Sequence, residues 1–280
     1  MIQVSQLYKK YEVREVLKGI DISIQGGEIF GLLGPSGAGK TTLIKILTGQ
    51  LQYDSGNVRI MDKNVTELTG RDQKQIGIMM DQFGVYERLS CYENLKIFAD
   101  IYGISKNQVR KTLCDVGLES VIKLPASNLS KGMKSRLQLA RVFMQNPKII
   151  FLDEPTSGLD PATTKEIHKL IFEKKAEGCT IFLTTHDMTE ATKLCGHVAL
   201  LNEGRIVEYG KPQEICRRYN HQKRLRIHLY NGFDEELPNN AESAKRLYDL
   251  MLEGAVQAIH STEPTLETVF LELTGRMIKE

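Results

Sequence analysis

The segment from residue 34 to residue 41 leaves this chain few possible folds. It reads Gly-Pro-Ser-Gly-Ala-Gly-Lys-Thr and fits the pattern G-x-x-x-x-G-K-[ST]. The apolar run Ile29–Leu33 precedes it, and Leu43, Ile44 and Leu47 follow it at helical spacing. A strand, a glycine-rich turn and a helix in this order arrange backbone N–H groups around phosphate oxygens at a helix N-terminus. The sequence therefore predicts a phosphate-binding loop within an α/β fold.

The loop uses both side chains and backbone to bind phosphate. We expect Lys40 to reach the β- and γ-phosphates of a nucleotide and the Thr41 hydroxyl to bind Mg²⁺. Lys40 is also a candidate catalytic residue, because it would neutralise phosphate charge during hydrolysis. The other candidate nucleotide-binding residues belong to the loop and to the start of its helix: Gly34, Pro35, Ser36, Gly37, Ala38, Gly39 and Thr42.

Two adjacent carboxylates follow a second apolar run. Residues 149–152 are Ile-Ile-Phe-Leu, and Asp153 and Glu154 come next. Ligands of open α/β sheets bind at the carboxyl ends of the strands, and neighbouring strand residues point to opposite faces. We expect Asp153 to hold Mg²⁺ or its water shell and Glu154 to polarise a water that attacks the γ-phosphate. Asp-Glu-Pro alone would suit an ordinary turn, and the upstream phosphate loop favours the catalytic interpretation.

Composition limits the class of protein that carries these motifs. Lys and Arg total 37 and Asp and Glu total 35 among 280 residues, so the formal net charge is +2 and no nucleic-acid partner is expected. No apolar run approaches the roughly 18 to 20 residues that span a bilayer, and the N-terminus is polar where a signal peptide is apolar. The five cysteines are widely spaced without a CxxC pair, which predicts no zinc site or disulfide framework and suits a reducing cytosol.

Apolar periodicity predicts the organisation of the first three quarters of the chain. Residues 1–33 and 51–80 have strand-like patterns, whereas residues 90–145 are mostly helical. Residues 149–201 alternate strand, helix and strand, as in a buried parallel sheet. Within them, Asp160-Pro161 predicts a helix N-cap followed by proline at the first helical position.

The last part of the chain has a different pattern and predicts a small α+β domain. The polar, basic stretch 217–224 is typical of a linker, which suggests a main domain of residues 1–216 and a second domain of residues 217–280. The second domain is expected to contain a strand, a helix, a strand and a helix, at 225–230, 241–252, 255–260 and 265–273.

Four further segments make the chain resemble the ATP-binding subunit of an ABC transporter. Residues 129–133, Leu-Ser-Lys-Gly-Met, are similar to the LSGGQ signature, and residues 157–160, Ser-Gly-Leu-Asp, are similar to the D-loop. His186 lies where that family has its switch histidine. Tyr11 lies where the family stacks an aromatic ring on adenine, with Tyr8 as the alternative. The resemblance covers about residues 1–215.

The resemblance implies a particular fold and a composite nucleotide site. The fold is a P-loop NTPase with an antiparallel β subdomain, a RecA-like parallel-sheet core and a helical subdomain at about residues 84–145. Two subunits would meet head to tail with ATP and Mg²⁺ between them. Ser130, Gly132 and Asp160 of one subunit would then serve the nucleotide of the other. His186 would contact the γ-phosphate and position water against Glu154.

The chain departs from the family pattern at two places. Lys131 replaces a glycine and Met133 replaces a glutamine in the signature, a variant that resembles drug- and lantibiotic-type exporters. The position of the family's Mg²⁺-binding glutamine falls on Asp81, with Gln82 next to it. Either side chain could ligate Mg²⁺, and register favours Asp81, whose carboxylate is the stronger ligand.

Together these features predict an ATP-hydrolysing subunit that powers an exporter of drug, peptide or lipid-like cargo. Residues 261–270 support the exporter type, because they resemble a C-terminal segment of such ATPases. The expected partners are a second ATPase subunit, the same or a paired one, and a separate transmembrane permease at the cytoplasmic face of the membrane. The isolated chain would be cytosolic.

Two alternatives are disfavoured. A soluble ABC ATPase of DNA repair or translation would need coiled-coil or zinc insertions, or two ATPase units. A module that senses ATP without turnover would not need both Glu154 and His186.

Overall fold

The chain folds into two units, each with its own sheet. The computed structural model describes residues 1–80, 84–221 and 223–275. The division between the units falls between Tyr209 and Gly210. Among the described residues, no helix is both long enough and apolar enough to cross a bilayer.

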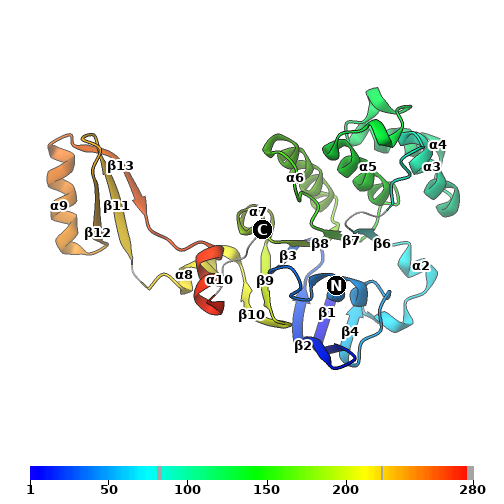
Figure 1. Cartoon of the computed structure of the whole chain (residues 1–280), viewed down its shortest axis with the longest axis horizontal. Coiled ribbons are helices and arrows are strands. Elements are labelled where there is room, and N and C mark those ends of the chain that lie inside the picture. Colours follow the sequence, from blue (N-terminus) through cyan, green and yellow to red (C-terminus); the bar gives the residue numbers. More distant parts are fainter. Residues whose placement is uncertain (81–83, 222, 276–280) are drawn as a thin grey trace. The chain divides into compact units, whose positions relative to one another are not determined.

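An antiparallel sheet forms the N-terminal part of the first unit (Figure 1). Its strand order is β2-β1-β4-β5. Alternation explains its buried face: Ile20, Ile22 and Ile24 of β2 are buried, and the residues between them are exposed. The strands are β1 (Ile2–Tyr11), β2 (Arg14–Ile24), β4 (Ser55–Ile60) and β5 (Lys63–Asn64).

A six-stranded sheet in the order β10-β9-β3-β8-β7-β6 forms the centre of the first unit. The five strands from β9 to β6 pair in parallel. The strands are β3 (Ile29–Leu33), β6 (Ile76–Met79), β7 (Ile149–Asp153), β8 (Thr180–Thr185), β9 (His197–Asn202) and β10 (Arg205–Gly210). All residues of β3, β7 and β8 are buried, as expected where both faces of a parallel sheet are covered.

The two sheets share one hydrophobic core. Phe30, Phe151 and Phe182 stand side by side on β3, β7 and β8, with neighbouring ring centroids 5.4 Å apart. Buried residues of β2 and of α1 (Lys40–Leu47) pack into the same core, among them Ile20 and Ile44. The core therefore fixes the start of α1 against the end of β3.

Helices within residues 131–194 contact the other side of the parallel sheet, and the helices within residues 91–143 form the region expected at residues 90–145 (Figure 1). Ser90, Ser105 and Ser130 each cap a helix through the side-chain oxygen. Asp160 accepts hydrogen bonds from the amides of Ala162 and Thr163, which confirms the predicted N-cap. The helices are α2 (Gly70–Gln73), α3 (Cys91–Tyr102), α4 (Lys106–Asp115), α5 (Lys131–Phe143), α6 (Pro161–Ala176) and α7 (Met188–Leu194).

The second unit contains a three-stranded sheet in the order β12-β11-β13. The strand predicted at residues 225–230 is present as β11, but β12, which pairs with it as a hairpin before the long helix, was not predicted. The sequence signal was Asn231-Gly232, with Gly232 at φ +83°, a pair typical of hairpin turns. The unit comprises α8 (Pro212–Arg218), β11 (Arg224–Leu229), β12 (Asp234–Pro238), α9 (Ala241–Leu252), β13 (Val256–Ser261) and α10 (Leu266–Thr274).

The stretch 217–224, predicted as a linker, includes the last turn of α8 and the first residue of β11. Arg217 and Arg218 end the helix, where their positive charge complements the helix dipole.

Candidate functional site

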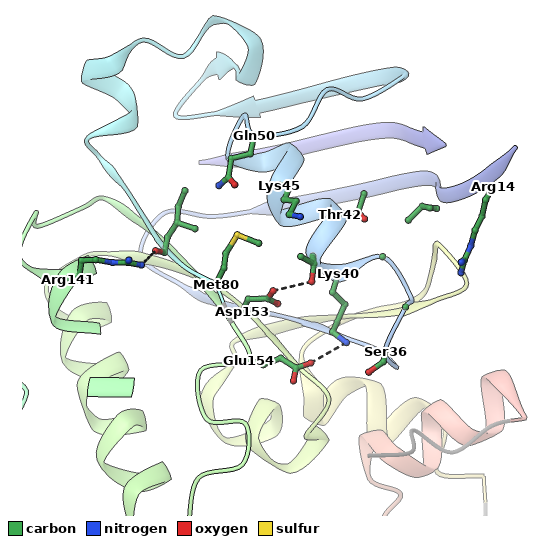
Figure 2. A pocket seen from close by; sticks show the side chains of 15 residues that line it. Arg14, Ser36, Lys40, Thr42, Lys45, Gln50, Met80, Arg141, Asp153 and Glu154 are labelled. Atoms are coloured by element: carbon green, nitrogen blue, oxygen red, sulfur yellow. Dashed lines mark hydrogen bonds and ion pairs between the residues drawn. The ribbon is translucent and has the colours of Figure 1, made fainter. Parts of the chain in front are cut away.

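A pocket of about 940 Å³ opens where β3 and β7 end and α1 begins (Figure 2). Eight of the residues predicted from the sequence line it: Ser36, Gly37, Gly39, Lys40, Thr41, Thr42, Asp153 and Glu154. The other seven lining residues were not predicted from the sequence: Arg14, Val16, Lys45, Gln50, Ile78, Met80 and Arg141. The phosphate loop and the acidic pair thus share one cavity.

The phosphate loop wraps around the ammonium group of Lys40. Lys40 is 6% exposed, and its Nζ donates to the carbonyl oxygens of Gly34 at 2.7 Å and Pro35 at 3.2 Å. Burial lowers the pKa of Lys40, and the nearby carboxylates of Glu154 and Asp153 oppose this effect. A side chain at Gly34 would place its Cβ 2.2 Å from the Leu201 carbonyl oxygen. Glycine there lets the loop lie directly against the end of β9.

Two hydroxyl groups hold the carboxylate of Asp153. Thr41 Oγ1 donates to Asp153 Oδ2 at 3.1 Å, and Thr184 Oγ1 donates to Asp153 Oδ1. Asp153 is buried and pairs with Thr184 in register between β7 and β8. The oxygens of Thr41 and Asp153 are hard ligands, and Mg²⁺ commonly takes only one or two protein ligands beside water and phosphate. The residues present therefore suit Mg²⁺.

No cluster of three His, Cys, Asp or Glu side chains that could hold a metal occurs within residues 1–80, 84–221 and 223–275.

Glu154 lies between the phosphate loop and His186. Its Oε1 is 3.6 Å from Lys40 Nζ, and its Oε2 is 3.1 Å from His186 Nδ1. Glu154 adopts φ +49°, a left-handed conformation uncommon for a residue other than glycine. Its amide donates to the Thr184 carbonyl at 3.1 Å, which holds this turn in place. Backbone strain of this kind occurs often at functional sites, and here it directs the carboxylate toward the pocket.

The signature and D-loop residues have contacts of their own and do not line this pocket. Ser130 caps α5 by accepting from the Met133 amide at 3.2 Å. Asp160 caps α6. A Cβ on Gly132 would lie 2.4 Å from Thr163 Cγ2, so its close approach within this chain is to Thr163. The structure does not bring these residues to the phosphate loop of the same chain.

The aromatic candidates lie beside the pocket rather than in it. Tyr11 is 46% exposed and faces Arg14 across the β1–β2 pair, and Arg14 lines the pocket. The ammonium of Lys9 lies 5.5 Å from the Tyr11 ring centroid. Tyr8 packs over Gly19 instead.

Asp81 and Gln82, the two candidate Mg²⁺ ligands of the Q-loop, lie outside the described residues.

Arg141 is the least expected residue of the pocket. It comes from α5, donates to the Ile78 carbonyl at 3.4 Å and lies 5.1 Å from the ring centroid of Phe98. Burial lowers the pKa of Arg141. The sequence signal for it is a cation within the mostly apolar run 137–144.

Comparisons with known proteins agree with this geometry. Residues 17–157 match the family model described as ABC transporter. A fluoroquinolones export ATP-binding protein of Mycobacterium tuberculosis is 38% identical over 94% of this chain and 88% of its own length. A linearmycin resistance ATP-binding protein of Bacillus subtilis is 28% identical over the full length of both chains.

A solved dimeric structure of an ATP-binding cassette, in a post-hydrolysis state with ADP and Pi, superposes with a TM-score of 0.68. It is 25% identical and covers 75% of this chain and 98% of its own. A solved ATP-binding subunit of an ABC transporter superposes with a TM-score of 0.70; it is 28% identical and covers 78% of this chain and 93% of its own. This similarity and the observed sheets confirm the predicted α/β fold, with its antiparallel sheet, parallel core and helical region.

Proposed function

The chain belongs to the ATP-binding proteins of ABC transporters, and from this premise we propose that its ATP hydrolysis drives export of a drug-like, peptide or lipid-like cargo. The names of two relatives, which refer to fluoroquinolone export and linearmycin resistance, support export. A match over 94% of this chain includes the second unit, so the likeness extends beyond the ATP-binding unit. The variant signature at residues 129–133 and the segment 261–270 also support export.

The protein is an ATPase, and we assign the hydrolytic roles to Lys40, Glu154 and His186. The observation that carries this assignment is the pair of contacts that Glu154 makes, to Lys40 on one side and to His186 on the other. Lys40 would bind the β- and γ-phosphates together with backbone N–H groups of residues 34–42 other than Pro35, which has none. Glu154 would accept a proton from the attacking water as the bond between the γ-phosphorus and the bridging oxygen breaks, giving ADP and phosphate. His186 would hold that water and contact the γ-phosphate.

Thr41 and Asp153 are the residues that would hold Mg²⁺ in this site. Their hydrogen bond shows that the two oxygens already lie together beside the loop. Bound there, the ion supplies neutralisation of phosphate charge. Asp81, with Gln82 as the alternative, stays a predicted further ligand.

Asp153→Asn should raise the Mg²⁺ concentration needed for half-maximal hydrolysis by at least about 10-fold, because an amide is a weaker ligand than a carboxylate. Titration of Mg²⁺ at saturating ATP measures this shift. Asp100→Asn, which changes an exposed carboxylate of α3, is the matched control and should leave the curve unchanged. An unchanged curve for Asp153→Asn would remove Asp153 from the metal site.

ABC ATPases dimerise and work with a membrane subunit, and we infer the same partners for this chain. Ser130, Gly132 and Asp160 would act on the nucleotide of the second ATPase subunit, which is consistent with their not lining the pocket of their own chain. Tyr11 would stack on adenine at the edge of the pocket, beside Arg14, with which it pairs between β1 and β2. Residues 1–216 would form the ATPase domain, and its helical region, at about 84–145, would contact the permease. Bound to the permease, the chain would lie at the cytoplasmic face of the membrane.

Purification of the tagged chain from detergent-solubilised cells of its source should recover a membrane protein with many spans. Inverted vesicles that contain this complex should take up a fluoroquinolone in the presence of ATP. Lys40→Ala should abolish uptake without preventing co-purification, because Lys40 lies in the nucleotide pocket. Recovery of only ribosomes or DNA-repair proteins would overturn the transport proposal and leave the ATPase assignment standing.

A further inference from the structure

A buried carboxylate outside the pocket links the segments that carry Glu154 and His186. Glu190 lies in the first turn of α7, four residues after His186, and is 3% exposed. Its Oε1 accepts a hydrogen bond from the Thr156 hydroxyl at 2.5 Å and lies 2.9 Å from Nε2 of His168. Thr156 follows Glu154 by two residues, and His168 lies on α6. One oxygen atom therefore ties together the turn after β7, helix α6 and helix α7.

The backbone around Glu190 completes a ring of interactions. The Glu190 amide donates to Asp187 Oδ1 at 2.9 Å, and the Asp187 amide donates to Thr185 Oγ1 at 3.0 Å. These bonds fix the first turn of α7 to the residues on either side of His186. The contact between Glu154 and His186 closes the ring. A shift of Glu190 would therefore change the distance between Glu154 and His186.

Stability alone does not explain a carboxylate at this position. Glu190 Oε2 is buried and accepts no hydrogen bond of good geometry within the part of the chain that the structure describes. Burial acts to raise the pKa of Glu190, yet hydrogen bonds, from His168 and Thr156 among others, hold that pKa below its ordinary value. A buried charge with one unpaired oxygen is costly, and well-packed apolar groups often replace such groups without loss of stability.

We propose that Glu190 is a positioning residue for hydrolysis that sets the separation of the Glu154 carboxylate and the His186 imidazole. The proposal rests on the roles assigned above to Glu154 and His186. Displacement of a reacting group by about 1 Å can lower a rate by about 100-fold. Lys40 and Thr41 come from α1, which Glu190 does not contact through any hydrogen bond of the described residues. Loss of Glu190 should therefore lower kcat and leave the KM for ATP nearly unchanged.

The test compares Thr156→Val with Thr156→Ser in the full chain. Valine keeps the shape of threonine and removes the hydroxyl that donates to Glu190, whereas serine keeps the hydroxyl. We expect kcat to fall by about 10- to 100-fold in Thr156→Val and in Glu190→Leu, with KM for ATP within about twofold of wild type. Thr156→Ser should retain the wild-type kcat. The comparison of Thr156→Val with Thr156→Ser keeps the test decisive even if Glu190→Leu fails to fold.

Asp72→Asn provides the control for loss of a buried carboxylate as such. Asp72 is buried and bonded to Lys63 and Thr69, away from the residues that line the pocket. The Asp72→Asn substitution should lower the temperature of unfolding and leave kcat per folded molecule unchanged. A fall in kcat equal to that of Thr156→Val would show a general effect of destabilisation and overturn the proposal.

A double-mutant cycle with Glu154→Gln separates this inference from the function on which it rests. Since Glu190 would act through Glu154, Thr156→Val should lower the residual rate of Glu154→Gln by less than twofold. If the double mutant loses rate by the full product of the two single-mutant losses, the proposal is contradicted. If Glu154→Gln alone leaves hydrolysis intact, the assigned role of Glu154 fails. If Glu154→Gln removes hydrolysis and Thr156→Val has the wild-type kcat, only the inference about Glu190 fails.

Discussion

Glu154→Gln should lower the rate of ATP hydrolysis by about 100- to 10,000-fold while ATP still binds. Glutamine keeps the size of glutamate and cannot accept the proton of the attacking water. The contacts of Lys40 with the loop carbonyls do not involve Glu154, so the binding of phosphate should survive. Phosphate release measures the rate, and equilibrium binding of a labelled nucleotide measures the affinity.

The same variant should accumulate as a dimer with ATP. In the proposed dimer, nucleotide would hold the two subunits together, and hydrolysis would let them separate. Size-exclusion chromatography with ATP and Mg²⁺ should therefore show a dimer for Glu154→Gln and a smaller dimer fraction for wild type. Glu177→Gln, which removes an exposed partner of Lys174, should behave as wild type. A purely monomeric Glu154→Gln protein would contradict the dimeric site, and unchanged hydrolysis would contradict the role of Glu154.

The parts of the site that could be predicted from the sequence are those formed by neighbours in the chain. The loop 34–41 follows directly from the order of strand, glycine-rich turn and helix, and the Asp160 cap depends on residues two and three positions away. The pairing of Asp153 with Thr41 was also predictable in outline, because carboxyl ends of parallel strands share one edge of the sheet.

The parts that were missed depend on contacts between distant segments or on weak local patterns. Arg141 reaches the pocket only because α5 packs beside β6, which periodicity along the helix cannot reveal. The strand Asp234–Pro238 has one apolar residue other than its proline, Leu237, so its pairing with β11 outweighs a sequence that looks like a loop. The tie between Glu190 and Thr156 joins residues 34 positions apart, and no motif marks it.

Lys40→Ala should raise the dissociation constant for ATP by about 100-fold. Hydrogen bonds to charged groups contribute about 1.5 to 3 kcal/mol, and about 1.4 kcal/mol corresponds to a factor of ten. The buried position of Lys40 puts its effect at the upper end of this range, since little water screens the ammonium. Lys40 also bonds to the carbonyls of Gly34 and Pro35, so its removal should loosen the phosphate loop.

Two controls separate loss of binding from loss of folding. Lys174→Ala removes a partly buried ammonium that pairs with Glu177 outside the pocket, and this variant should bind ATP as wild type does. Thermal unfolding of Lys40→Ala without nucleotide should remain cooperative, because the shared core of the two sheets does not include Lys40. Added ATP should raise the unfolding temperature of wild type and have little effect on Lys40→Ala, since a ligand stabilises only the state that binds it. Wild-type affinity in a folded Lys40→Ala protein would show that the backbone of the loop suffices for phosphate binding and that the ammonium does not contribute.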